Sequence, residues 1–391
     1  MRLALWLPRH RGKGHCGALT IRIFTTVPTA WGRRGPTRVS AALPTSAPRP
    51  LVSIVVPCRN EADHIRRLLD SILANEYPRE RLEVLIIDGM SDDGTRDVIA
   101  AYADRHPVIQ LLDNPKRTTP CALNLGIARA RGAVIMRMDA HAYYPPNYVA
   151  DLVDWLERTG AEYIGGAWVT VPGDTTPTAR AIAAVLAHPF GIGDSHYRLG
   201  TNEVREVDSL PFGCFRRELF ERLGLFDEEL VRNQDEEFSF RVLRAGGRVL
   251  LVPGVVCFYY ARRSLRQLGR MFYQYGLFKP LVALKLGRIM TLRQVVPAAF
   301  VLSVLLTIVA APWIAAARTL TALILGTYVA LNAACALVLG WRHGARVGLA
   351  AAGVFAVVHV CYGCGFLRGM LALLARSRGR PSDLSSTPLS R

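Results

Sequence analysis

The chain has 391 residues, of which 51% are hydrophobic and 20% charged, and this composition excludes a disordered polymer or a collagen-like repeat. The length predicts two domains, or one large domain with an appendage. The net charge of +17 comes from the two ends, because residues 1–50 hold nine basic residues and no acid, and residues 291–391 hold nine basic residues and one acid. Residues 51–290 hold 30 basic and 30 acidic residues. A neutral central region argues against a nucleic-acid-binding protein, whose folded domain carries its own basic surface.

Residues 1–50 are rich in Arg, Pro and Gly. We expect a basic, disordered tail here, which either touches anionic lipid or reflects an over-extended gene start. The apolar run after Met1 is interrupted by Pro8 and Arg9, so this end of the chain lacks the pattern of a secretory signal.

Residues 51–262 alternate between short apolar runs and amphipathic segments. Short, mostly apolar runs predict buried strands at 51–56, 82–87, 108–112 and 133–138. Apolar residues at helical spacing predict helices at 62–74, 97–105 and 120–130. This alternation predicts an α/β fold with a mostly parallel central sheet that is covered by helices on both faces.

Polar residues gather where the predicted strands end. Asp88 closes the second strand, Asp139 closes the fourth, and Asn60 and Glu61 follow Pro57 beyond the first. Ligands of parallel sheets bind beyond the carboxyl ends of the strands, so we expect a nucleotide and its metal ion at this edge. Neither a GxxxxGK[ST] loop nor a GxGxxG segment follows the first strand, which disfavours ordinary ATPases and dinucleotide-binding enzymes.

Residues 263–290 precede the most apolar part of the chain. The segment 264–286 carries Met271, Phe272, Tyr275 and Phe278 after a group of arginines, which predicts an amphipathic helix at a membrane interface.

Residues 291–370 contain three uncharged apolar stretches, at 295–317, 319–341 and 347–367. Each has at least 21 residues, enough to cross a bilayer as a helix. The basic residues before the first stretch and between the last two favour the cytoplasm for those segments. Three spans would then put the polar tail 371–391 outside the cytoplasm, although this tail is basic too. The side of the C-terminus therefore stays open, and the third stretch could be re-entrant.

Cys361 and Cys364 form a CxxC pair without the second pair that a zinc site needs.

Five motifs follow one another along residues 51–280: PCRNE (57–61), DGMSDDGT (88–95), MDAH (138–141), GCFRRELFERLGLFDE (213–228) and NQDEEFSFRVLRAGGRV (233–249). In order and spacing they resemble the family 2 glycosyltransferases of GT-A fold, which are inverting enzymes that use nucleotide sugars. Within that family the chain is similar to the glucosyltransferases of succinoglycan biosynthesis, which are membrane-attached and build lipid-linked oligosaccharides. The resemblance implies a GT-A domain at 51–262.

The resemblance implies that Asp235 is the catalytic base, with Glu236 in reserve. By position alone, either acid is equally well explained as a charge at the start of a helix, where the helix dipole favours it. As base, the carboxylate would take the proton of the acceptor hydroxyl while that oxygen attacks the anomeric carbon.

The resemblance also implies a metal site. Asp139 matches the first acid of the family's DxD motif, and His141 stands where the second acid is expected. We expect this pair to hold a divalent cation, Mn²⁺ or Mg²⁺, and an imidazole ligand would favour Mn²⁺. His141 either ligates the ion or only forms a hydrogen bond.

The remaining matched residues are expected to bind substrates. Those expected around the uridine of a UDP-sugar are Pro57, Arg59, Asn60, Glu61 and Asp88. Further substrate-binding candidates are Lys116, Arg117, Gly213, Cys214, Arg262, Arg263, Gln267 and Arg270. Of these, Gly213 and Cys214 match a small-residue turn that the family places near the acceptor. The arginines before the apolar stretches would either clamp a diphosphate or reach toward lipid headgroups.

We therefore expect a membrane-attached, inverting hexosyltransferase that moves a sugar, glucose in the similar enzymes, from a UDP-sugar to a saccharide on polyprenyl diphosphate. Its expected place is the inner or plasma membrane, crossed several times, with the GT-A domain in the cytoplasm and a role in cell-surface or exopolysaccharide biosynthesis. A processive polysaccharide synthase is one alternative, although Gln267 and Arg270 have the spacing of its QxxRW motif without the tryptophan. A second alternative is a non-catalytic membrane scaffold that binds nucleotide sugars, because the second acid of the DxD motif is missing.

Overall fold

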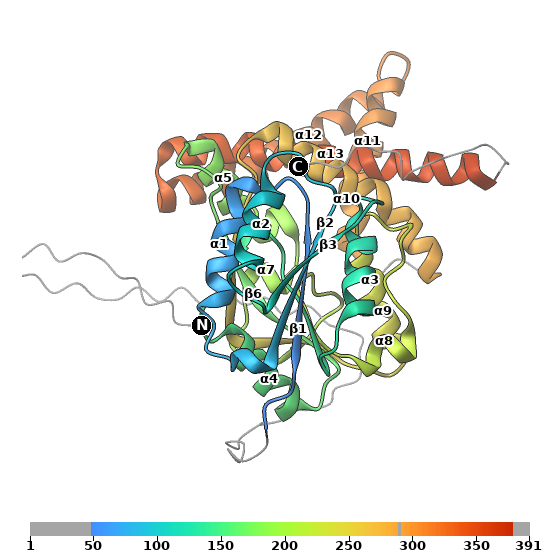
Figure 1. The fold of residues 1–391 in the computed structure, drawn as a ribbon. Helices are drawn as coiled ribbons and strands as arrows, with labels where there is room; N and C mark the ends of the chain where they lie inside the picture. Colours follow the sequence, from blue (N-terminus) through green and yellow to red (C-terminus); the bar gives the residue numbers. More distant parts are fainter. Residues whose placement is uncertain (1–47, 288–290, 378–391) are drawn as a thin grey trace, which may run out of the picture. The chain divides into compact units, whose positions relative to one another are not determined.

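The computed structural model describes residues 48–287 and 291–377 (Figure 1). Most of the predicted N-terminal tail and of the polar tail at 371–391 therefore lies outside the described residues. The strands of the described part form one nine-stranded sheet in the order β3-β2-β1-β4-β8-β6-β9-β5, and β7 pairs with β9.

The first half of the sheet is parallel, as the alternating pattern predicted. Its strands are β1 (Val52–Cys58), β2 (Leu82–Asp88), β3 (Ile109–Asp113) and β4 (Val134–Arg137). The connecting helices are α1 (Ala62–Leu73), α2 (Thr95–Ala103) and α3 (Thr119–Arg129). The predicted α/β fold with a mostly parallel central sheet is confirmed, and each predicted boundary lies within two residues of the observed one.

The second half of the sheet mixes directions. It contains β5 (Ala142–Tyr143), β6 (Tyr163–Val171), β7 (Arg205–Glu206), β8 (Cys214–Arg216) and β9 (Val249–Tyr260). β8 runs antiparallel to both β4 and β6, whereas β6 and β9 are parallel. The helices of this half are α4 (Tyr148–Thr159), α5 (Pro177–Val185), α6 (Pro189–Ile192), α7 (His196–Leu199), α8 (Glu218–Leu223) and α9 (Gln234–Arg244). Helices α5 to α7 lie in one insertion between β6 and β7.

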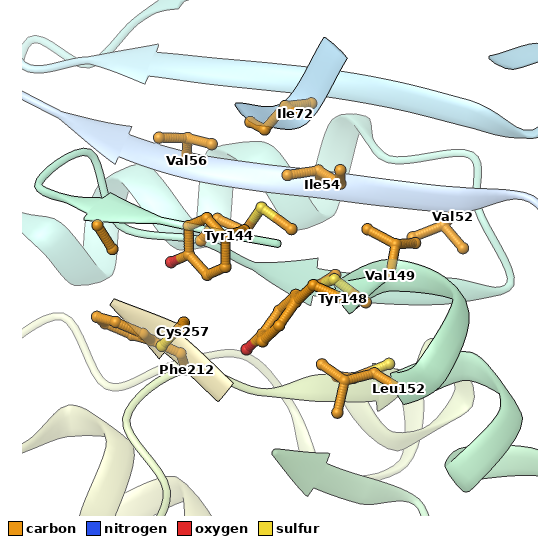
Figure 2. Packing of buried hydrophobic residues seen from close by; sticks show 14 of the residues in the cluster. Val52, Ile54, Val56, Ile72, Tyr144, Tyr148, Val149, Leu152, Phe212 and Cys257 are labelled. Atoms are coloured by element: carbon orange, nitrogen blue, oxygen red, sulfur yellow. The ribbon is translucent and has the colours of Figure 1, made fainter. Parts of the chain in front are cut away.

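The core lies on both faces of the sheet because alternate residues of a strand point to opposite sides. Val52, Ile54 and Val56 of β1 face α1 and α2, and their cluster extends to Tyr148 and Leu152 of α4 (Figure 2). Intervening strand residues such as Val55 of β1 pack with residues of α3 and with the phenylalanines of α8 and α9. Both faces are thus covered, and the edge where the parallel strands end is left for a site.

Four longer helices follow the sheet: α10 (Leu265–Leu286), α11 (Val296–Ala310), α12 (Ala315–His343) and α13 (Ala345–Ser377). α10 matches the predicted helix at 264–286 and packs along α13 at very short range. A Cβ added at Gly276 of α10 would lie 2.1 Å from the Tyr362 carbonyl oxygen, and one at Gly365 of α13 would lie 2.0 Å from that of Tyr273. Glycines let helix backbones approach closely, as they do between helices within membranes. These contacts pack α10 directly against the apolar helix α13.

Two of these helices, α12 and α13, are long and apolar enough to cross a bilayer. The structure differs from the sequence prediction at the first span, which we expected at 295–317. α11 has 15 residues, about 22 Å of helix, against about 30 Å of bilayer core. The chain turns at 311–313 around Pro312, because proline lacks the backbone donor and restricts the residue before it. The other two predicted stretches lie within α12 and α13, each a continuous helix.

Candidate active site

One cavity of about 940 Å³ begins at the carboxyl ends of the parallel strands. Residues that follow each of β1 to β4 contribute to its wall, including Arg59, Gly89, Asn114 and Asp139. The volume lies at the upper end of the range for ligand sites, so the cavity can hold a ligand as large as a nucleotide sugar.

The same cavity continues to the apolar helices. Side chains of α11, α12 and α13 line that end, among them Phe300, Leu323, Leu331 and Val358. The cavity therefore has a polar end at the sheet and an apolar end between α11 and the two helices, α12 and α13, that are long and apolar enough to cross a bilayer.

Backbone strain marks the loops around the polar end. Among the described non-glycine residues, positive φ angles occur at Asn60 (53°), Met90 (58°), Arg117 (60°) and Asn233 (64°). The first three follow β1, β2 and β3, and the fourth precedes α9. Residues other than glycine rarely adopt positive φ angles, and residues held in this backbone conformation cluster at functional sites.

Arg137, at the end of β4, links two of the predicted site acids. Its Nε donates to Oδ1 of Asp139 at 2.9 Å, and its Nη1 donates to a carboxylate oxygen of Asp235. Burial opposes a charge on Arg137, but the two carboxylates outweigh it and raise its pKa above the ordinary value. The structure thus brings together Asp139 and Asp235, the two acids that the family resemblance implied for the site.

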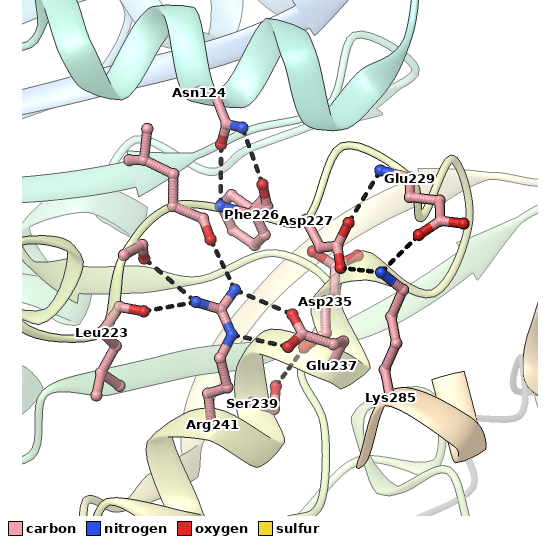
Figure 3. Close-up of polar contacts among 12 residues, drawn as sticks. Asn124, Leu223, Phe226, Asp227, Glu229, Asp235, Glu237, Ser239, Arg241 and Lys285 are labelled. Carbon is pink, nitrogen blue, oxygen red and sulfur yellow. Dashed lines mark hydrogen bonds and ion pairs between the residues drawn. The ribbon is translucent and has the colours of Figure 1, made fainter. Parts of the chain in front are cut away.

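Asp235 stands at the start of α9, and a polar network fixes that end of the helix (Figure 3). Arg241 holds Glu237 through hydrogen bonds of 2.8 and 2.9 Å and also donates to the carbonyls of Leu223 and Leu225. Burial raises the pKa of Asp235 to about 6, the charge of Asp139 adds to the rise, and Arg137 opposes it. A carboxylate with a pKa near neutral is suited to accept a proton.

Glu236, the reserve candidate for the base, also lines the cavity but is bound to two neighbours. One of its carboxylate oxygens pairs with Nζ of Lys279 in α10, and the other accepts a hydrogen bond from the side chain of Gln294. Both oxygens are therefore occupied, and the acid serves to tie α9 to α10 and to the segment before α11.

His141 lies beside Glu61 in the cavity wall, with its Nδ1 3.3 Å from Oε1 of that acid. Burial alone would raise the pKa of Glu61, but His141 and Arg262 outweigh it, so the pKa lies below the ordinary value. Asp139 lines the same wall. Within the described residues no three His, Cys, Asp or Glu side chains gather as a complete metal site. One carboxylate and one imidazole facing a cavity fit a cation whose other ligands come from a diphosphate and water.

Polar atoms without partners concentrate on this cavity. Ten buried side-chain nitrogen or oxygen atoms lack a hydrogen-bond partner among the described residues, and six of them belong to residues of the cavity wall. These six are Nε of Arg59, Oδ1 of Asn114, Oγ1 of Thr118, Nη1 of Arg198, Nε of Arg262 and the hydroxyl of Tyr362. Buried polar groups are normally paired, so this distribution indicates a wall that is completed by a polar ligand.

Comparison with known proteins identifies the family. The family model described as "Glycosyl transferase family 2" matches residues 53–224. The chain is 32% identical over 325 residues to the "Succinoglycan biosynthesis protein ExoA" of Rhizobium meliloti, covering 81% of this chain and 94% of that protein. The chain belongs to glycosyl transferase family 2. This confirms the family resemblance seen in the motifs and makes the protein a glycosyltransferase.

Two further proteins are similar to this family 2 glycosyltransferase. One is the "Dolichyl N-acetyl-alpha-D-glucosaminyl phosphate 3-beta-D-2,3-diacetamido-2,3-dideoxy-beta-D-glucuronosyltransferase" of Methanococcus voltae, 27% identical over 60% of this chain and 74% of that protein. The other is the solved structure "Mannosyltransferase PcManGT from Pyrobaculum calidifontis in complex with GDP-Man and Mn2+". It is 23% identical with a TM-score of 0.49, covering 80% of this chain and 86% of that one.

The predicted site residues of this glycosyltransferase fall into two groups. Those that line the cavity are Pro57, Arg59, Glu61, Arg117, Asp139, His141, Asp235, Glu236 and Arg262. Those that lie outside its wall are Asn60, Asp88, Lys116, Gly213, Cys214, Arg263, Gln267 and Arg270.

Several residues of the second group have structural partners instead. Asp88 is fully buried, and its carboxylate accepts hydrogen bonds from Arg96 at 2.8 Å and from the backbone of the loop after β2. Lys116 is 69% exposed and pairs with Glu228. Gly213 has no room for a side chain, because a Cβ would lie 2.2 Å from the Tyr163 ring.

The three residues around the start of α10 are also engaged locally or exposed. Arg263 pairs with Asp63 at 3.1 Å, the Gln267 side chain accepts from the backbone nitrogen of Arg263, and Arg270 is exposed. The QxxR spacing therefore lies away from the cavity, which weakens the processive alternative.

Sequence reasoning missed several cavity residues, including Arg137, Arg198, Lys279 and Gln294. For Arg137 a signal existed, since it is the only charge in the run 133–138 and shares a strand face with Asp139. The others lie in the insertion or on the C-terminal helices, where nothing in the sequence points toward the sheet.

Proposed function

We propose that this glycosyltransferase is a membrane-attached, inverting enzyme that transfers a hexose, glucose first among the candidates, from a UDP-sugar to a saccharide on polyprenyl diphosphate. The observation that carries the proposal is the continuity of one cavity from Asp139 and Asp235 to the apolar walls of α11, α12 and α13. A nucleotide sugar fits the polar end, and a lipid-linked acceptor fits the apolar end.

The roles proposed for the site residues follow from their surroundings. Asp139 and His141 would hold a divalent cation, which would neutralise charge on the departing diphosphate. Arg59, Asn114 and Thr118 offer the unpartnered atoms at the nucleotide end. The cation is a proposal for this chain, with Mn²⁺ favoured over Mg²⁺ by the imidazole.

Asp235 would act as the base. Its carboxylate would accept the acceptor's hydroxyl proton as the acceptor oxygen forms its bond to the anomeric carbon. The bond from that carbon to the diphosphate oxygen would break on the opposite face, and its electron pair would leave with UDP. Arg137 would keep the carboxylate oriented through its hydrogen bond.

A place in cell-surface or exopolysaccharide biosynthesis is supported by the name of the similar Rhizobium meliloti protein. The inner or plasma membrane, with the GT-A domain in the cytoplasm, is supported by the basic residues that flank the apolar stretches.

The test uses membranes that contain the full chain, Mn²⁺, labelled UDP-glucose, UDP-galactose or UDP-N-acetylglucosamine, and a lipid extract. We expect one label to enter the organic phase, and none with membranes lacking the protein. Label in a long polymer would instead support a processive synthase. UDP binding without transfer or hydrolysis of any donor would support the non-catalytic scaffold.

A further inference from the structure

One guanidinium in the cavity wall has no counter-ion. Arg198, in α7, is 8% exposed, and its Nη1 has no hydrogen-bond partner. The rings of Trp168, Tyr197 and Tyr259 face it, with its Cζ 4.6, 5.5 and 5.2 Å from the three ring centres. The hydroxyl of Tyr197 also forms a hydrogen bond with the guanidinium, and Tyr275 interacts with it electrostatically. No carboxylate pairs with it among residues 48–287 and 291–377.

An unpaired buried charge is costly for a fold, and contacts with aromatic faces offset only part of that cost. By contrast, Arg137 and Arg241 are buried or half-buried in the same domain and each is paired with a carboxylate. The absence of a carboxylate partner therefore indicates that Arg198 binds a negatively charged ligand in the cavity.

A second arginine supports the same reading. Arg262 also lines the cavity, and its Nε lacks a partner. Both guanidinium groups lie close enough to Tyr259 to influence its hydroxyl electrostatically. His141 contacts the same tyrosine, with ring centres 5.3 Å apart. The two arginines thus lie around Tyr259, one aromatic ring away from the predicted metal ligand, and Arg262 also acts electrostatically on Glu61.

The segment that carries Arg198 is fastened to the apolar helices. The carbonyl of Phe190 in α6 lies 2.7 Å from Nε2 of His359 in α13, and the Phe190 ring lies 6.2 Å from that of Tyr328 in α12. Arg198 follows six residues after α6 ends at Ile192. The segment thus runs from the apolar helices, at Phe190, to the sheet residues Trp168 and Tyr259, at Arg198.

We propose that Arg198 and Arg262 form the subsite for the phosphate groups of the lipid-linked acceptor, whose hydrocarbon chain lies along the apolar wall of α11, α12 and α13. The subsite rests on the proposed function in taking a lipid diphosphate as the acceptor. The cavity wall carries the two arginines near the sheet and apolar side chains on α11, α12 and α13. A ligand with an anionic head and an apolar chain matches this arrangement better than the nucleotide sugar does, because the diphosphate of the nucleotide sugar is proposed to bind beside Asp139.

The test replaces Arg198 by Met in the detergent-solubilised full chain. Binding of farnesyl diphosphate, inorganic diphosphate, farnesol and UDP with Mn²⁺ is measured by calorimetry. We expect the Kd for farnesyl diphosphate to rise at least tenfold, while the Kd for UDP stays within twofold. Binding of farnesol should be weak and unchanged. Arg216→Met is the matched control, because Arg216 lies outside the cavity and pairs with Glu157, so it should leave all four ligands unaffected.

Thermal unfolding provides a second readout. Because the ligand-free protein buries Arg198 without a counter-ion, Arg198→Met should keep or raise the ligand-free Tm, and it should abolish the Tm increase that farnesyl diphosphate gives the wild type. A large loss of ligand-free Tm would overturn the unpaired-charge argument, since a structural arginine would behave in that way.

Other results would also overturn the subsite. Loss of UDP binding with farnesyl diphosphate binding intact would assign Arg198 to the donor, and unchanged binding of both would leave it without a ligand role. The two proposals can fail separately. If the wild type transfers no sugar but binds farnesyl diphosphate, and Arg198→Met loses that binding, the subsite stands and the proposed function fails.

Discussion

Asp139 and Asp235 lie on either side of one guanidinium, that of Arg137. The Arg137 Nε to Asp139 Oδ1 distance is 2.9 Å, and the Nη1 atom of the same group pairs with Asp235. One buried cation therefore sets the separation of the acid predicted to hold a metal and the acid predicted to take a proton. A cation that binds at Asp139 would share that carboxylate with Arg137, which donates to both of its oxygens.

The first prediction concerns pH. Burial raises the pKa of Asp235 to about 6 in the metal-free protein, and a base must be ionised to act, so kcat/KM should fall as the pH drops. A cation at Asp139 cancels part of the negative charge that raises this pKa, so the acid limb should lie no higher than about pH 6. Arg137 lowers this pKa, so Arg137→Gln should move the acid limb to higher pH. The measurement is kcat/KM between pH 4.5 and 8 with saturating metal. A limb that moves to lower pH in the variant would contradict the pairing.

The second prediction concerns the metal. Asp139→Asn should lower kcat by about 100-fold or more, because it removes the carboxylate that places positive charge at the diphosphate. His141→Asp restores an acid at the second position and should lower the ratio of activity with Mn²⁺ to activity with Mg²⁺. Both are measured in metal titrations of chelator-treated protein. An unchanged ratio would mean that His141 serves Glu61 rather than the ion.

Much of the sheet could be predicted from the sequence because its signals are local. The runs at 51–56 and 82–87 are apolar apart from Ser53 and Glu83, which hydrogen-bond to each other, because both faces of β1 and β2 are covered. The run at 133–138 leads directly to Asp139, which lies in the cavity wall. The same reasoning could not foresee that the Asp88 side chain turns away from the cavity wall toward Arg96. The end of a strand determines where a residue's backbone lies, but the hydrogen bonds of its side chain depend on neighbours from other segments of the chain.

The contribution of the insertion and the C-terminal helices could not be predicted. Arg198 and Lys279 reach the cavity through tertiary packing, and neither lies at a predicted strand end. The first apolar stretch was predicted as a single span because hydropathy does not register the break at Pro312, where backbone geometry ends the helix.

The third prediction tests the core. A Cβ at Gly126 of α3 would lie 2.4 Å from Cγ1 of Val55 and 2.8 Å from Cδ1 of Ile87. Gly126→Ala should therefore destabilise the domain by about 1–3 kcal/mol through overpacking. The neighbouring Leu125 is 41% exposed, so Leu125→Ala should change stability by less than about 0.5 kcal/mol. Denaturant unfolding of both variants checks the difference, and equal stabilities would contradict the close packing of α3 on β1 and β2.

The fourth prediction tests membrane attachment. Val329 lies in the middle of α12 and is 61% exposed. If lipid covers this surface, Val329→Arg costs about 2.5–3.5 kcal/mol of insertion energy. We expect more of this variant than of Val329→Leu to be released from membranes by alkaline carbonate. Equal retention of the two variants would argue that α12 does not contact lipid.

The most direct measurement compares Asp235→Asn with Glu236→Gln for UDP binding and for sugar transfer. Asp235→Asn should bind UDP with Mn²⁺ as the wild type does and lose transfer by about a thousandfold or more, because only the base is removed. Glu236→Gln breaks the pair with Lys279, so its Tm should fall, while the folded protein keeps transfer within about tenfold. Near-normal transfer by Asp235→Asn, with loss confined to Glu236→Gln, would contradict the assignment of the base and the cavity-centred mechanism built on it.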